Sequence, residues 1–153
     1  MAAINPDRLL ADLDHLRTFG ASENGVVRPS LSDVDIRSRH WLLERMRAAG
    51  LDARIDGVGN VFGRSPNRGP ALLIGSHSDT QPRGGWLDGA LGVIYGLEVA
   101  RALAEDPTTA HLAVDAVSWM DEESTCLGCL GSRSFCGVLD KDAEAAAKNA
   151  DGQ

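Results

Sequence analysis

The chain of 153 residues lacks several features that would assign it to a common class. It has no apolar run long enough to cross a membrane, so we expect no membrane contact. Its start, MAAINPDRLLADLDHLRTFG, has no basic lead before an apolar core, so we expect no secretory signal. Basic residues are outnumbered, with 15 Lys and Arg against 22 Asp and Glu, and they form no stripe. This distribution argues against nucleic-acid binding.

Cysteine is also scarce, with Cys126, Cys129 and Cys136 lying close together in the chain. An odd count without a signal peptide predicts reduced thiols and a cytoplasmic protein. The CxxC of Cys126 and Cys129 leaves a structural zinc site or a redox pair open. However, no second CxxC or HxxxH completes a set of four ligands. Buried thiols under a loop are the favoured interpretation.

What is present suits one globular domain with a modest core, at 43% hydrophobic and 24% charged residues. Apolar spacing predicts a helix between Pro6 and Gly20. A second helix is expected to follow Ser32, its N-cap, and to end near Gly50. The stretch 51–64 predicts two tightly joined strands, typical of a hairpin. The apolar stripe of the second helix is assigned to Ile36, His40, Leu43, Met46 and Arg47.

A βαβ unit is predicted next in the chain. Residues 70–76, PALLIGS, form a short apolar run typical of a strand that is buried on both faces. A helix over 87–107, with Asp88 at a capping position, and a strand over 111–120 follow it. Both strands are expected to be parallel, with their carboxyl ends at the edge where α/β sheets bind ligands. Asp115 predicts that one side of the second strand is solvated.

This topology gathers polar side chains at one edge of the sheet. His77 comes just past the first strand, Asp88 opens the helix, and residues 121–123, Asp-Glu-Glu, follow the second strand. Imidazole with carboxylates is the ligand set that suits zinc, and also manganese or cobalt, at a hydrolytic site. Asp79 lies two residues after His77, where its carboxylate can hold the second ring nitrogen and fix the tautomer.

The adjacent Glu122 and Glu123 permit two roles, because one can bind metal while the other handles a proton. A metal ion lowers the pKa of its bound water towards roughly 7, and a nearby carboxylate can take the proton. The pattern therefore indicates metal-assisted hydrolysis. Spacing alone leaves the ordinary interpretations open, in which His77 is a loop or core residue, Asp88 only a helix cap, and 121–123 a solvated turn.

A nucleotide site is not expected, although glycines precede the predicted helix over 87–107 as they do in phosphate-binding loops. The segment RGGWLDGALG contains no GxxxxGK[ST] motif. The carboxylate of Asp88 at the start of the helix would also repel a phosphate.

Three segments, GSHSDTQPRGGWLDGALGV, WMDEES and LGSRSFCG, resemble the binuclear-metal amidohydrolases that cleave N-carbamoyl-L-amino acids, allantoate and β-ureidopropionate. That family is a branch of the aminopeptidase-like metallohydrolases. Residues 25–64 also look like the family's helix followed by paired strands. The resemblance implies an α/β fold, a three-layer αβα aminopeptidase-like catalytic domain. Residues 1–153 would be an incomplete, N-terminal part of it, without the dimerisation or lid domain.

The resemblance also implies roles for particular residues. His77 would bind one metal ion, Glu123 the second, and Asp88 would bridge both. The ions would be divalent, with zinc as the first candidate. Metal-bound hydroxide would attack the carbonyl carbon of a small N-carbamoyl or ureido substrate, with Glu122 as general base. Asp79 would orient His77.

Other consequences of the resemblance concern the surroundings of this site. Gly84, Gly85 and Gly89 would let the backbone turn tightly around Asp88. Arg133, in LGSRSFCG, would contact the substrate. A homodimer is expected for the full-length protein.

The sequence departs from the family pattern in two ways. Family members draw two further metal-binding histidines from later in the chain, and His15, His40 and His111 match neither of them. A truncated, catalytically inactive fragment is therefore an alternative. The loop STCLGCLGSR also differs from the common Gly-x-Arg-Phe, which leaves the ureido substrate open. An aminopeptidase or deacylase of the same superfamily is the alternative enzyme.

Overall fold

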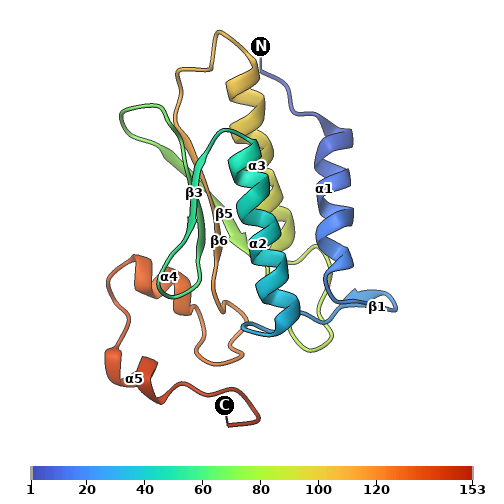
Figure 1. The fold of residues 1–153 in the computed structure, drawn as a ribbon, viewed down its shortest axis with the longest axis vertical. Coiled ribbons are helices and arrows are strands. Elements are labelled where there is room, and N and C mark those ends of the chain that lie inside the picture. The colour runs from blue at the N-terminus through green and yellow to red at the C-terminus, as the bar shows by residue number, and fades with distance from the viewer. Residues whose placement is uncertain (1, 153) are drawn as a thin grey trace.

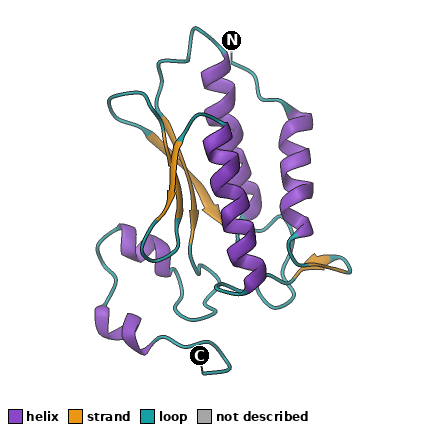
Figure 2. Cartoon of the chain, viewed as in Figure 1, coloured by secondary structure: helices purple, strands orange, loops and turns teal. Residues whose placement is uncertain are grey.

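The computed structural model describes residues 2–152. A sheet of order β3-β4-β6-β5 has α1, α2 and α3 along one face, and α4 and α5 lie toward the C-terminal end of the chain (Figure 1). The elements are α1 (Pro6–Thr18), β1 (Ala21–Ser22), β2 (Gly25–Val26), α2 (Asp33–Ala48), β3 (Asp52–Ile55), β4 (Val61–Arg64), β5 (Leu72–His77), α3 (Ala90–Glu105), β6 (Val114–Trp119), α4 (Leu130–Phe135) and α5 (Lys141–Ala146). Figure 2 shows that a loop joins β6 to the short helix α4, and that a second loop joins α4 to α5.

Both N-terminal helices begin where the sequence predicts. Asn5 caps α1 by accepting a hydrogen bond from the Arg8 amide at 3.0 Å, with Pro6 in the first turn. The Ser32 hydroxyl caps α2 by accepting from the Asp35 amide at 3.2 Å. These local signals fix both helix starts without help from the rest of the chain.

The predicted apolar stripe of α2 is wrong in part. Ile36 and His40 are exposed, as is Arg47. The buried residues of α2 are instead Asp35, Ser38, Arg39, Leu42, Leu43 and Met46. The face that packs inward is therefore partly charged, because Asp35 and Arg39 pair with each other and Arg39 also finds partners elsewhere in the fold.

The sheet confirms the hairpin and the βαβ unit. Strands β3 and β4 pair antiparallel, with Asp52 opposite Arg64. Strands β5 and β6 pair parallel, from Leu72 opposite Val114 to His77 opposite Trp119. Strand β5 is half-buried rather than fully buried, because among residues 2–152 it forms an edge of the sheet. The carboxyl ends of β5 and β6 lie side by side, as expected.

The two faces of the sheet are covered differently. A continuous core joins α1, α2 and α3 to residues such as Val61, Val114 and Ala116. On the opposite face, Phe135 of α4 packs 5.1 Å from the Trp119 ring, centroid to centroid. Asp115 points to this second face, where it is half-buried and accepts from the Ser65 amide at 2.8 Å, consistent with the predicted solvated side. Helix, sheet and helix thus form three layers, although the third is short in the described part of the chain.

Buried charges join α1 to α3. Glu98 is fully buried and accepts hydrogen bonds from Arg8 at 2.8 and 2.9 Å. Asp12 pairs with Arg101 at 2.6 Å and with Arg45 at 2.8 Å. Because each buried carboxylate has a cationic partner, the helix face tolerates charge that would otherwise be costly to bury.

Replacing Glu98 with glutamine is expected to lower the free energy of unfolding by roughly 3 kcal/mol near neutral pH, by breaking this pair. Burial by itself would raise the pKa of Glu98, but the hydrogen bonds and charge of Arg8 hold that pKa below its usual 4.5. The stabilisation is therefore present above pH 4.5 and lost as the pH falls through the lowered pKa. Urea titrations should show a variant deficit that shrinks under acid conditions, and an equal deficit at both pH values would contradict this assignment.

Among residues 2–152, no helix is both long enough and apolar enough to span a bilayer.

Candidate metal centre

The loop after β6 is shaped by a buried carboxylate. Asp121 has a positive φ of 52° and is fully buried. Its side chain accepts hydrogen bonds from the amides of Thr125 at 2.7 Å, Cys126 at 2.9 Å and Leu127 at 2.6 Å. This organising role was missed from the sequence, where Asp121 was grouped with the two glutamates that follow it. The signal was available, since Asp side chains commonly bond amides a few residues ahead.

The start of α3 differs from the prediction. The N-cap is Gly89, with φ 65°, and Asp88 makes no side-chain cap; only its carbonyl accepts, from the Ala90 amide at 2.6 Å. The capping role assigned to Asp88 is therefore wrong. Gly89 lies against the imidazole, because a Cβ at this position would meet His77 Nε2 and Cδ2 at 2.5 Å. This close approach brings the Asp88 side chain to the end of β5.

Three side chains converge at the carboxyl edge of β5 and β6. His77, Asp88 and Glu123 each offer a ligand atom, and these atoms all lie within 4.8 Å of one another. His77 is buried, Glu123 half-buried and Asp88 exposed, so the group opens to solvent on one side. It is the only such group of His, Cys, Asp or Glu side chains within residues 2–152.

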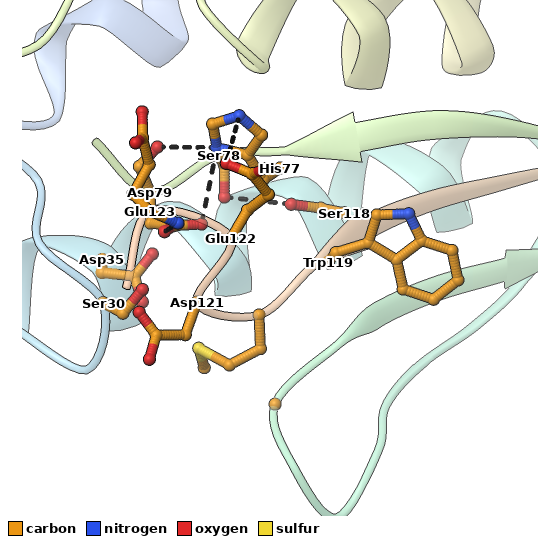
Figure 3. A network of polar contacts seen from close by, with 12 residues as sticks. Ser30, Asp35, His77, Ser78, Asp79, Ser118, Trp119, Asp121, Glu122 and Glu123 are labelled. Atoms are coloured by element: carbon orange, nitrogen blue, oxygen red, sulfur yellow. Dashed lines mark hydrogen bonds and ion pairs between the residues drawn. The ribbon is translucent and has the colours of Figure 1, made fainter. Parts of the chain in front are cut away.

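Glu122 and Gln81 border this group. Glu122 Oε2 lies 3.5 Å from His77 Nε2, and its side chain remains 44% exposed (Figure 3). Gln81 Nε2 donates to Glu123 Oε2 at 2.7 Å and to the Glu123 carbonyl at 3.0 Å. The sequence analysis did not single out Gln81, because only the folded chain brings it to Glu123.

Asp79 contacts both ligand-bearing segments in an unexpected way. His77 Nδ1 lies 3.0 Å from the Asp79 main-chain carbonyl but 3.7 Å from its carboxylate Oδ1. The carboxylate turns instead to the Glu123 amide, which donates to Oδ2 at 3.1 Å (Figure 3). Asp79 thus orients the ring mainly through its backbone, while its side chain links the end of β5 to the loop after β6.

The electrostatics of the group suit a cation. Burial by itself would lower the pKa of His77, but Asp79 and then Glu122 act against it and raise that pKa overall. Burial would raise the pKa of Asp79, yet the His77 ring and the Glu123 amide lower it overall. The raised pKa of His77 reports negative charge around the imidazole, and the lowered pKa of Asp79 keeps that carboxylate ionised. A divalent cation would neutralise this negative charge, and imidazole with carboxylates is a fitting donor set for zinc.

The glycines before α3 are not equivalent. A Cβ at Gly84 would meet the Thr80 Cβ at 2.7 Å, so the turn requires glycine there. A Cβ at Gly85 would meet nothing closer than the Asp88 Cβ at 4.0 Å. The predicted need for glycine is therefore supported at Gly84 and Gly89, and not at Gly85.

A family model for peptidase family M28 matches residues 58–152, which is more than half of the chain. The chain belongs to peptidase family M28. This M28 chain resembles the N-carbamoyl-L-amino acid amidohydrolase of Geobacillus stearothermophilus, with 34% identity over 146 residues. That alignment covers 92% of this chain and 36% of the relative. The ureidoglycolate hydrolase of Arabidopsis thaliana is 33% identical over 142 residues, covering 88% and 30% respectively.

A solved structure of the same kind agrees with the M28 fold. The crystal structure of an amidase of the hydantoinase/carbamoylase family from Burkholderia phymatum matches with a TM-score of 0.98 and 63% identity. The match covers 99% of this chain and 38% of that one. The predicted resemblance and the α/β aminopeptidase-like fold are confirmed. The chain spans only about a third of the length of the curated relatives it matches.

Two other predicted features of this M28 chain lie away from the metal group. Arg133 lies in α4, and its side chain makes no hydrogen bond or ion pair within residues 2–152, so its contact with substrate stays a prediction. Cys126 is half-buried, whereas Cys129 and Cys136 are exposed, so the prediction of buried thiols is wrong for those two. Burial, then the charge of Asp121, raises the pKa of Cys126, which argues against an activated thiol.

Proposed function

We propose that this chain carries part of the metal site of a hydrolase that cleaves amide carbon–nitrogen bonds of small N-carbamoyl or ureido compounds. The convergence of the His77, Asp88 and Glu123 donor atoms within 4.8 Å is the observation that carries the proposal. The printed names of the relatives, an N-carbamoyl-L-amino acid amidohydrolase and a ureidoglycolate hydrolase, support this substrate class.

His77, Asp88 and Glu123 would hold divalent metal, with zinc as the first candidate and manganese or cobalt as the others. Two ions are proposed, because Asp88 has two carboxylate oxygens and lies on the open side of the group, where it can bridge. When bound, the metal would polarise the substrate carbonyl and lower the pKa of water.

Glu122 is the proposed general base. Its carboxylate lies beside His77 Nε2 but is nearly half exposed, so it can reach a water molecule and a substrate at once. It would take a proton from the attacking water and deliver it to the leaving nitrogen. Asp79 would keep Glu123 in place, because its carboxylate accepts a hydrogen bond from the Glu123 amide at 3.1 Å.

A cleft of about 340 Å³ next to the group is the proposed substrate site. Gln81 and Glu123 belong to both the cleft and the metal centre. The wall also includes Pro29, Thr80, Pro82 and Thr125, which gives the mixed polar and apolar lining typical of small-molecule sites.

Replacing Glu122 with glutamine is expected to lower hydrolysis about 100-fold or more while leaving metal content unchanged, because only the proton acceptor is removed. The assay is ammonia release from N-carbamoyl-L-amino acids and ureidoglycolate by the zinc-loaded chain. Cleavage of peptides or acyl amino acids without ureido hydrolysis would favour the aminopeptidase or deacylase alternative. Bound metal without hydrolysis of any of these substrates would favour the inactive fragment.

A further inference from the structure

A group of buried charges lies behind the metal centre. It comprises Arg28, Asp35, Arg39 and Asp79, called here the buried quartet, and each is at most 1% exposed. Arg39 Nε pairs with Asp35 Oδ2 at 2.9 Å, and Arg39 Nη2 lies 3.7 Å from Asp79 Oδ1. Arg28 Nε donates to the Ser78 carbonyl at 2.6 Å. Two cations and two anions balance, so the quartet as a whole is neutral.

Arg39 contacts several segments at the carboxyl edge of the sheet. Its Nη1 donates to the carbonyl of Trp119, the last residue of β6, at 3.3 Å. The same atom donates to the Gly59 carbonyl, in the turn between β3 and β4, at 3.2 Å. With Asp79, which follows β5, Arg39 thus joins three segments that are distant in the sequence. Asp79 extends this connection to Glu123 through the amide hydrogen bond.

Stability alone is a poor explanation for this arrangement. Buried ion pairs contribute little net stability unless their geometry is excellent and their hydrogen bonds are complete. Asp35 Oδ1, Arg39 Nη2 and Asp79 Oδ1 make no hydrogen bond with any residue of the described chain. The separation of 3.7 Å between Arg39 and Asp79 is also longer than a hydrogen bond. An apolar pair would fill the same space at less cost in desolvation.

We propose that Arg39, held by Asp35, is a positioning residue that fixes the Asp79 carboxylate and thereby sets the placement of Glu123 relative to His77. The inference rests on the proposed metal function and adds residues of α2 to it. Fixing the donors before the ion arrives removes the ordering cost that binding would otherwise carry. Arg39 itself contacts main-chain carbonyls and the Asp35 carboxylate behind the site.

The test compares two double variants of the 153-residue chain. Asp35→Leu with Arg39→Met removes the positioning pair, and the remaining Arg28 and Asp79 still balance in charge. Asp12→Leu with Arg101→Met removes a matched buried pair, with a 2.6 Å contact, between α1 and α3. Zinc affinity is measured by chelator competition, stability by urea unfolding, and the Glu123 amide by hydrogen exchange in metal-free protein.

The Asp35→Leu/Arg39→Met chain is expected to bind zinc about 10- to 100-fold more weakly than wild type. It should also exchange the Glu123 amide faster. The Asp12→Leu/Arg101→Met chain should change in stability only. Arg39→Lys, which keeps the charge but not the planar fork, should show a smaller loss of affinity and provides the test if the double variant fails to fold.

Wild-type zinc affinity and wild-type Glu123 exchange in both Arg39 variants would overturn the positioning role. Equal effects of the two double variants on affinity would also overturn it, because loss of stability would then explain both. If wild type binds no more zinc than His77→Ala, the proposed metal function fails instead. Hydrogen exchange at Glu123 still decides the role of Arg39 in that case.

Discussion

Replacing His77 with alanine is expected to weaken zinc binding roughly 100-fold or more, because it removes the only nitrogen donor of the group. The remaining donors, Asp88 and Glu123, are both carboxylates and lie on the more open side. Without the imidazole, two carboxylates remain for both proposed ions, well short of the three protein ligands that each catalytic zinc typically has. The loss of metal should therefore be nearly complete after dialysis.

The measurement is the content of zinc, manganese and cobalt per chain after purification without chelator, followed by chelator titration. The His77→Ala, Glu123→Ala double variant should retain no specific metal. His111→Ala is the matched control, because His111 is exposed and precedes β6 at the opposite end from the site. Equal metal in wild type and in the double variant would mean that this arrangement of donors does not bind metal, and the proposed function would be wrong.

Replacing Gly89 with alanine is expected to lower the free energy of unfolding by about 3 kcal/mol and to weaken zinc binding at the same time. The residue has φ 65° and ψ −51°, a conformation that L side chains rarely adopt. The new Cβ would also lie 2.5 Å from His77 Nε2, Cδ2 and carbonyl oxygen. Either the imidazole or the start of α3, which carries Asp88, must move to relieve this contact.

Gly85→Ala provides the comparison, because its new Cβ would meet nothing closer than 4.0 Å and the backbone there is not in the left-handed region. Urea unfolding and zinc titration of the two variants should separate them, with Gly85→Ala close to wild type in both. If Gly89→Ala matched Gly85→Ala in stability and zinc affinity, the tight packing of α3 against His77 would not be needed for the site.

The starts of α1 and α2 and the βαβ unit were predictable because their causes are local. Asn5 and Ser32 accept hydrogen bonds from amides three residues ahead, so each cap depends only on a short segment of sequence. The parallel pairing of β5 with β6 follows from the order of the elements and the handedness of the crossover. That pairing alone places His77 near the residues after Trp119.

The errors concern residues whose surroundings come from distant parts of the chain. Asp88 is of a residue type that commonly caps helices, but α3 approaches His77 closely and its N-cap is Gly89. The buried face of α2 was assigned by helical spacing from Ile36, which left out Arg39 and Asp35. Asp35 pairs with Arg39 one turn away, and the burial of Arg39 is acceptable because partners 40 or more residues away, such as Asp79 and Trp119, also meet it.

Sequence patterns predicted the first two helices, the hairpin, the βαβ unit, the edge at which the site forms and the residue types that suit a divalent metal, but not β1, β2 or α4. The tertiary structure decided which donors meet within 4.8 Å, and that Asp79 holds Glu123 by its side chain and His77 by its carbonyl. The fold also places the Arg39 guanidinium next to the Asp79 carboxylate. This division follows from the distance along the chain over which each effect acts. Caps and strand patterns depend on neighbours in sequence, whereas a buried charge is tolerated only where the folded chain places a counter-charge beside it.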